Sequence, residues 1–190
     1  PQGEITVSHP RNLLVFEDNT QATVIESYIG LGHDVYLTNA VTECVLGQNA
    51  TAEHCRLEWE STSAFHIATL QVQQARSSNF VSHAIAAGGA LARHDINVVL
   101  DGEGGENTLN GLFMATDQQH IDNHTRIDHV RPHCTSRELY KGILDDRAYA
   151  DTVARSEIAR KPAGKSFLVA KLRSRGVDDK TARAAADLAV

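Results

Sequence analysis

Four histidines and a cysteine crowd into one short segment, and these side chains are the ones in the sequence best suited to bind a metal ion. They are His120, His124, His129, His133 and Cys134. Imidazole nitrogen and thiolate sulfur are common zinc ligands. On a helix, spacings of four residues would align pairs on one face. On a strand, His120 and His124 would face one way, and His129 and His133 the other, which divides the set.

Carboxylate and amide side chains stand between these histidines. Asp117, Asp122, Asn123 and Asp128 can accept hydrogen bonds from imidazole N–H groups, as buried polar groups require. We therefore expect a structural polar ladder rather than a lasting metal site. The alternative is a metal-dependent hydrolase or a polysaccharide lyase that uses the histidines with Asp117, Asp122 or Asp128.

The three cysteines, Cys44, Cys55 and Cys134, are too few and too odd in number for a disulfide framework, which favours a reducing compartment. An imidazolium beside a thiol lowers the thiol pKa, so Cys134 next to His133 could be an activated thiolate. Adjacent strand residues face opposite ways, however, and free cysteine is usually buried. We expect all three to be small buried residues.

The glycine-rich run DGEGGENTLNG, which contains Gly102 to Asn107, resembles a phosphate-binding loop only superficially. No Walker lysine follows it and it does not open a helix. We expect a turn. No serine, histidine and aspartate in a recognisable order stand out elsewhere.

The residues from 1 to 150 form short apolar or alternating runs of strand length, separated by turn signals. This pattern fits a β-sandwich, a β-barrel or a β-solenoid. Strands that arrive every 10 to 14 residues, mostly without hairpin dipeptides between them, favour a solenoid. The expected core residues are Leu13, Val15, Val24, Ile25, Leu70, Val99, Leu112 and Ile143.

From residue 151 to 190 the composition changes to helix formers, with candidate helices at 166–175 and 178–189. Gly176 suits a helix C-cap, and Asp178 or Asp179 can cap the second helix. We therefore expect two domains, 1–150 and a basic helical segment at 151–190.

The net charge of −6 argues against generic nucleic-acid binding, which needs clustered Lys and Arg. Residues 151–190 hold nine basic and five acidic residues, a balance of +4, which leaves −10 for the rest. No apolar run reaches the roughly 18 residues that a membrane span requires. No N-terminal run resembles a signal peptide. Length and apolar content allow a sizeable core.

The histidine segment contains the short motifs QHIDNHT and VRPHCTS, and the motif ELYKGIL follows directly after it. All three resemble the SufB/SufD family of SUF iron–sulfur cluster assembly proteins, most closely its SufD branch. The later motif LRSRGVDDKTAR resembles the C-terminal helical segment of that family. The resemblance implies an all-β core, a right-handed parallel β-helix over about residues 1–150, followed by a small C-terminal α-helical segment.

The resemblance also implies a function: a non-catalytic scaffold subunit that pairs with a SufB-like subunit or with itself. A SufC-like ATPase would dock on the matched residues Leu172, Arg173, Ser174, Arg175 and Gly176. Tyr140, Lys141 and Gly142 are candidates for the subunit interface. No cofactor is expected to bind permanently, ATP belongs to the partner, and an iron–sulfur cluster would form transiently at the level of the complex, in the cytoplasm or a plastid stroma.

Two parts of the family pattern are not seen in this sequence. One is a helical region ahead of the β-helix. The other is a set of further strands, between ELYKGIL and LRSRG, that ends in a Cys-x-His-Gly-type motif. Residues 151–165 hold neither cysteine nor histidine. The sequence therefore nominates no residue as a cluster ligand.

Overall fold

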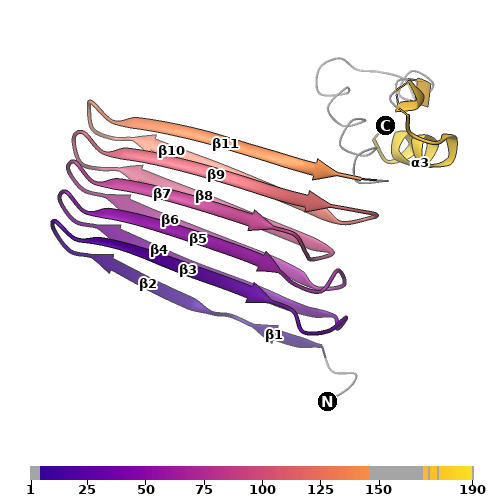
Figure 1. The fold of residues 1–190 in the computed structure, drawn as a ribbon, viewed down its shortest axis with the longest axis horizontal. Coiled ribbons are helices and arrows are strands. Elements are labelled where there is room, and N and C mark those ends of the chain that lie inside the picture. The colour runs from indigo at the N-terminus through magenta and orange to yellow at the C-terminus, as the bar shows by residue number, and fades with distance from the viewer. Residues whose placement is uncertain (1–4, 146–168, 171, 175, 190) are drawn as a thin grey trace. The chain divides into compact units, whose positions relative to one another are not determined.

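The structure is a computed structural model that describes residues 5–145, 169, 170, 172–174 and 176–189. Its strands form a parallel β-solenoid of about five turns, which confirms the expected fold class (Figure 1). Contacts divide the chain into residues 1–113 with 120–142, and residues 114–119 with 143–190. The boundary predicted at residue 150 lies outside the described residues.

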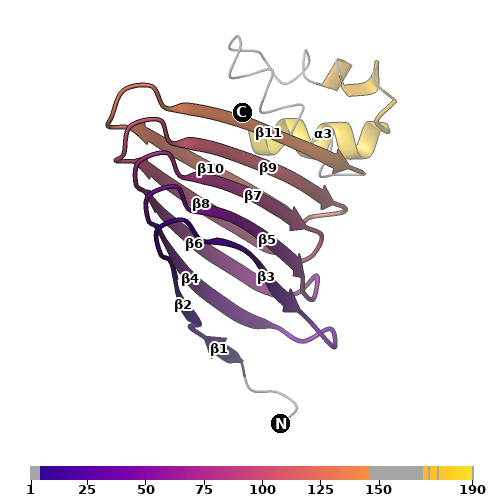
Figure 2. The same cartoon turned by 60° about the vertical axis from the view of Figure 1, so that its left-hand side comes forward.

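Two parallel sheets make up the solenoid, and Figures 1 and 2 show them as two facing ladders. The first has the order β1-β4-β6-β8-β10, with β2 also paired to β4, and the second the order β11-β9-β7-β5-β3. Odd and even strands after β2 therefore alternate between sheets, so each turn contributes one strand to each. The bounds are β1 Thr6–Ser8, β2 Arg11–Phe16, β3 Gln21–Ile29, β4 Tyr36–Leu46, β5 Thr51–Trp59, β6 Phe65–Gln74, β7 Asn79–Ala86, β8 Leu91–Leu100, β9 Glu106–Ala115, β10 His120–His129 and β11 Thr135–Leu144.

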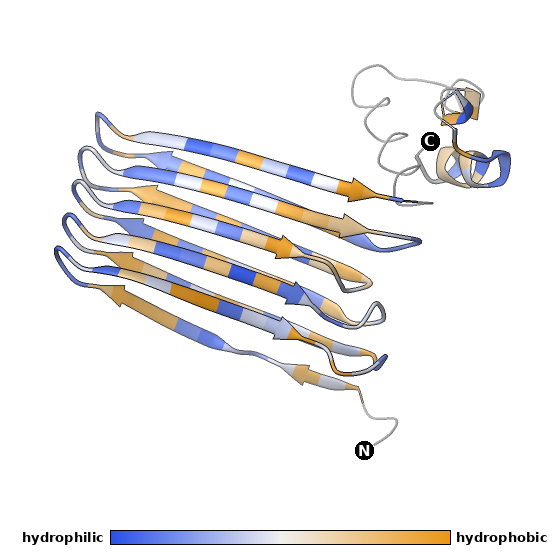
Figure 3. Cartoon of the chain, viewed as in Figure 1, coloured by the Kyte–Doolittle hydropathy of each residue, from blue (hydrophilic) through white to orange (hydrophobic). Residues whose placement is uncertain are grey.

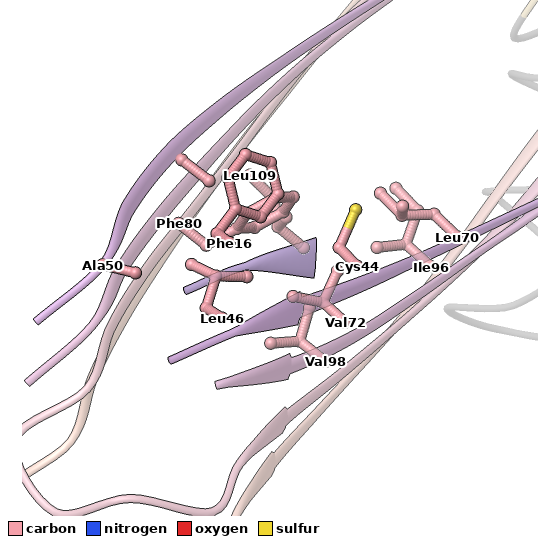
Figure 4. Close-up of a cluster of buried hydrophobic side chains, with 11 residues drawn as sticks. Phe16, Cys44, Leu46, Ala50, Leu70, Val72, Phe80, Ile96, Val98 and Leu109 are labelled. Atoms are coloured by element: carbon pink, nitrogen blue, oxygen red, sulfur yellow. The ribbon is translucent and has the colours of Figure 1, made fainter. Parts of the chain in front are cut away.

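The core fills the space between the sheets, because alternate side chains of each strand point inward. Along β8 every second residue is buried. Hydrophobic and hydrophilic residues alternate along several strands of the front sheet in Figure 3. The buried apolar cluster draws on strands of both sheets (Figure 4). Its members are Phe16, Cys44, Leu46, Ala50, Ala52, Leu70, Val72, Phe80, Ile96, Val98 and Leu109.

The predicted core was largely wrong, because the inward-facing parity of several strands was assigned one residue out of step. Of the eight predicted residues, Leu70 is buried and Val24 packs against the core. Val99 is only half-buried, beside the buried Val98. The remaining five are exposed on outer faces: Leu13 65%, Val15 62%, Ile25 73%, Leu112 38% and Ile143 58%.

A structural period is present that the sequence did not reveal as a repeat. Leu37 pairs with Phe65, and Phe65 with Leu91, steps of 28 and 26 residues. The same turn in successive coils contains one residue whose φ lies in the left-handed region, a conformation that glycine and asparagine tolerate best. These residues are Asn19 (φ 59°), Asn49 (56°), Ser77 (54°), Gly104 (71°) and His133 (61°). The glycine-rich run is a turn, as expected, since Glu106 already opens β9.

The C-terminal segment contains the helix α3, Asp179–Ala189. The Asp178 carboxylate accepts the backbone N–H groups of Lys180 and Thr181 at 3.0 Å, so Asp178 is the N-cap. Gly176 has a φ of 91°, and its N–H donates to the Arg173 carbonyl, which confirms the predicted helix end. Among the described residues, no helix has the length and apolarity to span a membrane.

Candidate functional site

A set of acid, base and phenol side chains lies inside the β-helix, between the two sheets. We call them the interior acid–base cluster. They come from β3, β5, β6 and β8 and from the turn after β5, and each has an acid, base or phenol group within the core. The members are Glu26, Tyr28, His54, Arg56, Glu58, Glu60, His66 and His94.

Glu26 and His54 form one pair of this cluster. Nε2 of His54 lies 3.0 Å from a Glu26 oxygen, and the other oxygen accepts the Tyr28 hydroxyl at 2.5 Å and the Thr42 hydroxyl at 2.8 Å. Burial acts to raise the pKa of the Glu26 carboxyl, but the hydrogen bonds from His54, Tyr28 and Thr42 outweigh it and lower the pKa to about 2. Glu26 is therefore a carboxylate at neutral pH.

Glu60 and His66 form a second pair. Nδ1 of His66 lies 2.6 Å from one Glu60 oxygen, and the Thr38 hydroxyl donates to the other at 2.9 Å. Burial opposes the charge, yet the His66 hydrogen bond holds the pKa of Glu60 below its usual value. The His66 ring also makes an edge contact with Tyr28, with ring centroids 4.7 Å apart. This contact links the two pairs.

Three further members carry polar atoms that have no hydrogen-bond partner among the described residues: Arg56 Nε, Glu58 Oε2 and His94 Nδ1. Arg56 lies over the Tyr28 ring, 5.6 Å from its centroid. Burial raises the pKa of Glu58 and lowers that of Arg56. Burial, with Arg56 nearby, also lowers the pKa of His94 well below the usual histidine value. Each shift favours the neutral form, so desolvation dominates here.

The arrangement includes a serine–histidine–carboxylate relay, which is the geometry of a nucleophilic catalyst. Ser82 Oγ lies 3.4 Å from His54 Nδ1, and His54 Nε2 lies 3.0 Å from Glu26. Ser82 is 1% exposed, however. The adjoining space of about 180 Å³ is too narrow to admit a water molecule. This arrangement can fix side chains and hold protons, but it does not present a nucleophile to a substrate.

Sequence reasoning missed this cluster, because its members are scattered along four strands and meet only through the coil stacking. A signal was present. Cluster members recur at every second position of single strands, as in His54, Arg56 and Glu58, the period that places side chains on one face. Charged residues with this spacing, in a strand that is otherwise buried, indicate a row of polar side chains that points into the core.

The histidine segment forms β10 and the turn after it, and the structure does not bring the four histidines together. His124 is on the outer face, where it contacts Asp122 at 3.0 Å. His129, of opposite parity, contacts the Ser136 hydroxyl at 3.0 Å. His133 lies in the turn rather than on the strand, contrary to the strand-based prediction. The described residues contain no group of three or more His, Cys, Asp or Glu that could hold a metal ion.

The acidic residues of the alternative enzyme site have other partners. Asp122 accepts Arg93 at 3.0 Å as well as His124, and Asp128 pairs with Arg126 at 2.8 Å. Asp117 lies in a turn with a φ of 49°. The predicted ladder of carboxylates and imidazoles therefore exists in part, but on the outer face of the β-helix and with arginine as the main partner.

Of the cysteines, Cys44 alone is fully buried, and burial raises its thiol pKa to about 12. Cys55 and Cys134 are partly exposed, so the expectation that all three are buried was wrong for these two. The Cys134 thiol donates to the Gly102 carbonyl at 3.3 Å, which fixes the turn rather than activating the sulfur.

Tyr140, Lys141 and Gly142, the interface candidates, lie on β11. The Tyr140 ring packs against the buried core, and burial raises its pKa to about 12. It lies over Gly111 of β9, and the Phe113 ring lies against Gly142 in the same manner. Tyr140 and Gly142 thus face inward, whereas Lys141, of opposite parity, faces outward.

The predicted ATPase-docking residues differ from one another in burial and in contacts. Leu172 is 0% exposed and packs with Ala182 and Ala185, so it stabilises the helical segment and cannot insert into a partner's groove as placed. The Arg173 side chain is exposed and pairs with Asp179 at 3.2 Å. Ser174 lies at the end of the short helical stretch that precedes Gly176, and its N–H donates to the Ala170 carbonyl. Arg175 lies outside the described residues.

Comparison with known proteins gives consistent matches. The family model of the SUF system FeS cluster assembly SufBD core domain matches residues 2–166. SufD of Escherichia coli is 30% identical over 147 residues, covering 77% of this chain and 35% of the relative. A SufBD family protein of Synechocystis is 32% identical over 149 residues, 74% and 33%. The chloroplastic protein ABCI7 of Arabidopsis thaliana is 30% identical over 141 residues, 74% and 30%. The chain therefore spans about a third of the length of these relatives.

Proposed function

The chain belongs to the SufBD core family of the SUF iron–sulfur cluster assembly system, and from this membership we propose that it is a non-catalytic scaffold subunit, most like SufD. The observation that carries the proposal is the family match to residues 2–166, a range that includes every strand of the β-helix. The interior supports it, since the narrow space beside Glu26, His54 and His94 has no room for a substrate. The histidines of the alternative enzyme site are on different faces, which disfavours that alternative.

We propose that pairing with a SufB-like subunit, or with a second copy, uses the edges of β10 and β11. Among the described residues, each of these strands pairs on one side only. An unpaired edge offers backbone N–H and C=O groups for strand addition. The interface candidate Lys141 faces outward beside that edge, while Tyr140 and Gly142 support β11 from within.

Hydrogen-bond alternation along β11 provides a sharp test. The N–H of Thr135 donates to the carbonyl of Gly105, directly before β9, and the N–H of Asp145 donates to the carbonyl of Ala115, the last residue of β9. By alternation along the strand, the N–H of Glu138 is directed to the free edge. Glu138→Pro should leave the β9 ladder intact but abolish co-purification with a SufB-like partner or the homodimer. Glu138→Gln is the control, because it keeps an acceptor for the Thr125 hydroxyl. A Glu138→Pro variant that folds and still pairs would contradict the edge assignment.

The C-terminal helical segment is the proposed docking surface for a SufC-like ATPase. Leu172 is buried within this segment, whereas Arg173 is exposed, so we propose Arg173 as the residue that contacts the ATPase. Arg173→Glu should slow ATPase association most strongly at low salt and leave α3 folded. Leu172→Ala should cost about 2–5 kcal/mol and unfold α3, which hydrogen exchange would show. Survival of ATPase pull-down after deletion of residues 166–190 would place the docking surface elsewhere.

In this proposal the chain binds no permanent cofactor, and ATP is bound by the partner. The iron–sulfur cluster is the cargo of the complex, built transiently among its subunits. Its compartment would be the cytoplasm or a plastid stroma, and one relative carries the description chloroplastic. Reconstitution of cluster assembly with and without this chain tests whether the chain contributes to building the cluster. Metal analysis of the purified chain tests whether it binds a permanent cofactor, and stoichiometric metal on the isolated chain would contradict the proposal.

A further inference from the structure

His94 of β8 has surroundings that suit only the neutral form of its ring. The side chain is 3% exposed and Nδ1 has no hydrogen-bond partner among the described residues. The charged groups that act most strongly on it are His54 and Arg56 from β5, His66 from β6 and Glu26 from β3. Glu26, Tyr28, His54 and Arg56 line the same narrow space as His94. From β10, its neighbour in register is the uncharged Asn123.

Two carboxylates of the cluster, Glu26 and Glu60, are committed to other donors and are not free to accept a proton from His94. Glu26 accepts His54, Tyr28 and Thr42, and Glu60 accepts His66 and Thr38. One Glu58 oxygen accepts the Glu60 amide and the other has no partner among the described residues. Burial raises the pKa of Glu58, however, which favours its neutral form over a carboxylate that could balance a charge on His94. A protonated His94 would therefore place a second buried cation beside Arg56, which is strongly unfavourable.

We propose that His94 is a proton-operated latch of the β-helix interior. With the ring neutral, β5, β6 and β8 stay packed around a closed acid–base cluster. Protonation of the ring opens these strands locally and admits water to the cluster. The latch is a property of this chain's own fold and is independent of the proposed scaffold role.

The direction of the pH effect follows from linkage. The folded state lowers the pKa of His94, so the open chain binds a proton that the closed chain does not, and stability is lost as the pH falls below about 6.5. Glu58 acts in the opposite sense, because its raised pKa stabilises the folded state as the pH falls. The contribution of His94 must therefore be measured as a difference between variants that share Glu58.

The experiment is amide hydrogen exchange on the full chain between pH 7.5 and 5.5, corrected for the intrinsic pH dependence of exchange. In the wild type, the opening constant of β5, β6 and β8 should rise below pH 6.5 by up to about tenfold per pH unit more than in His94→Gln. His124→Gln removes an exposed histidine of the neighbouring β10 and should behave like the wild type. If His94→Gln fails to fold, His94→Phe replaces it.

Two results would overturn the proposal. One is a His94 variant that keeps the wild-type pH dependence in β5, β6 and β8. The other is a wild-type loss of protection that is equal in all strands, which would mean global unfolding rather than a local latch.

Discussion

Neighbouring residues of one strand have opposite environments in this protein, and Val98 and Val99 of β8 show it most directly. Val98 is 1% exposed inside the β-helix, whereas Val99 is half-buried on the outer face and in register with Asp128. Val98→Lys buries an unpaired ammonium and should cost several kcal/mol, comparable with the whole stability of a domain. Val99→Lys should change stability by less than about 1 kcal/mol, since its ammonium group can remain in solvent on the outer face. Urea denaturation of both variants checks this, and equal losses would refute the inward parity of β8.

A second residue-scale prediction concerns acid stability. Because the pKa of Glu26 is lowered to about 2, its contribution to folding is complete above about 4.5 and is lost as the pH falls from there toward 2. Glu26→Gln should cost about 1–3 kcal/mol at neutral pH, as expected for hydrogen bonds to a charged group. It should also flatten the stability profile between pH 5 and 2, as followed by urea denaturation. An unchanged acid limb would mean that other carboxylates govern acid unfolding.

At the scale of elements, β9 and β11 fit together through glycines that leave room for aromatic rings. A Cβ on Gly111 would overlap the Tyr140 ring. Gly111→Ala should therefore destabilise β11 by about 1–3 kcal/mol through overpacking. In Gly111→Ala with Tyr140→Ala the penalty of the alanine should largely vanish, so a double-mutant cycle of thermal unfolding should show coupling above about 0.5 kcal/mol. Additive effects would show that the ring does not occupy this place.

The β-helix is a stack of coils, so the smallest deletion that it should tolerate is one whole coil. Deletion of residues 77–103 removes β7 and β8 and joins Arg76 to Gly104, two positions of the same recurring turn. The shortened chain should fold with lower stability, because each coil contacts mainly its neighbours. Deletion of residues 77–90 removes only β7 and forces later strands onto the opposite sheet. Circular dichroism melts should show a cooperative transition for the first deletion and none for the second.

Much of the architecture follows from local chemistry in the sequence. The apolar runs and turn signals placed most strands, and the caps at Gly176 and Asp178 located the end of one helix and the start of α3. The sequence motifs in β10 and β11 that resemble the SufB/SufD family identified the fold. β10 is polar along most of its length, so an apolar run does not mark it as a strand, and its pairing with β8 holds it in the sheet.

What only the tertiary structure decided is which side of each strand faces inward and which distant residues meet there. Leu13 and Ile25 are apolar yet exposed, while Arg56 and Glu58 are charged yet buried, so residue type does not fix parity. Parity depends on the register between coils, which ladder hydrogen bonds set over separations of 26 to 30 residues. The interior acid–base cluster arises from that stacking alone, because its members contact one another only after the coils have aligned.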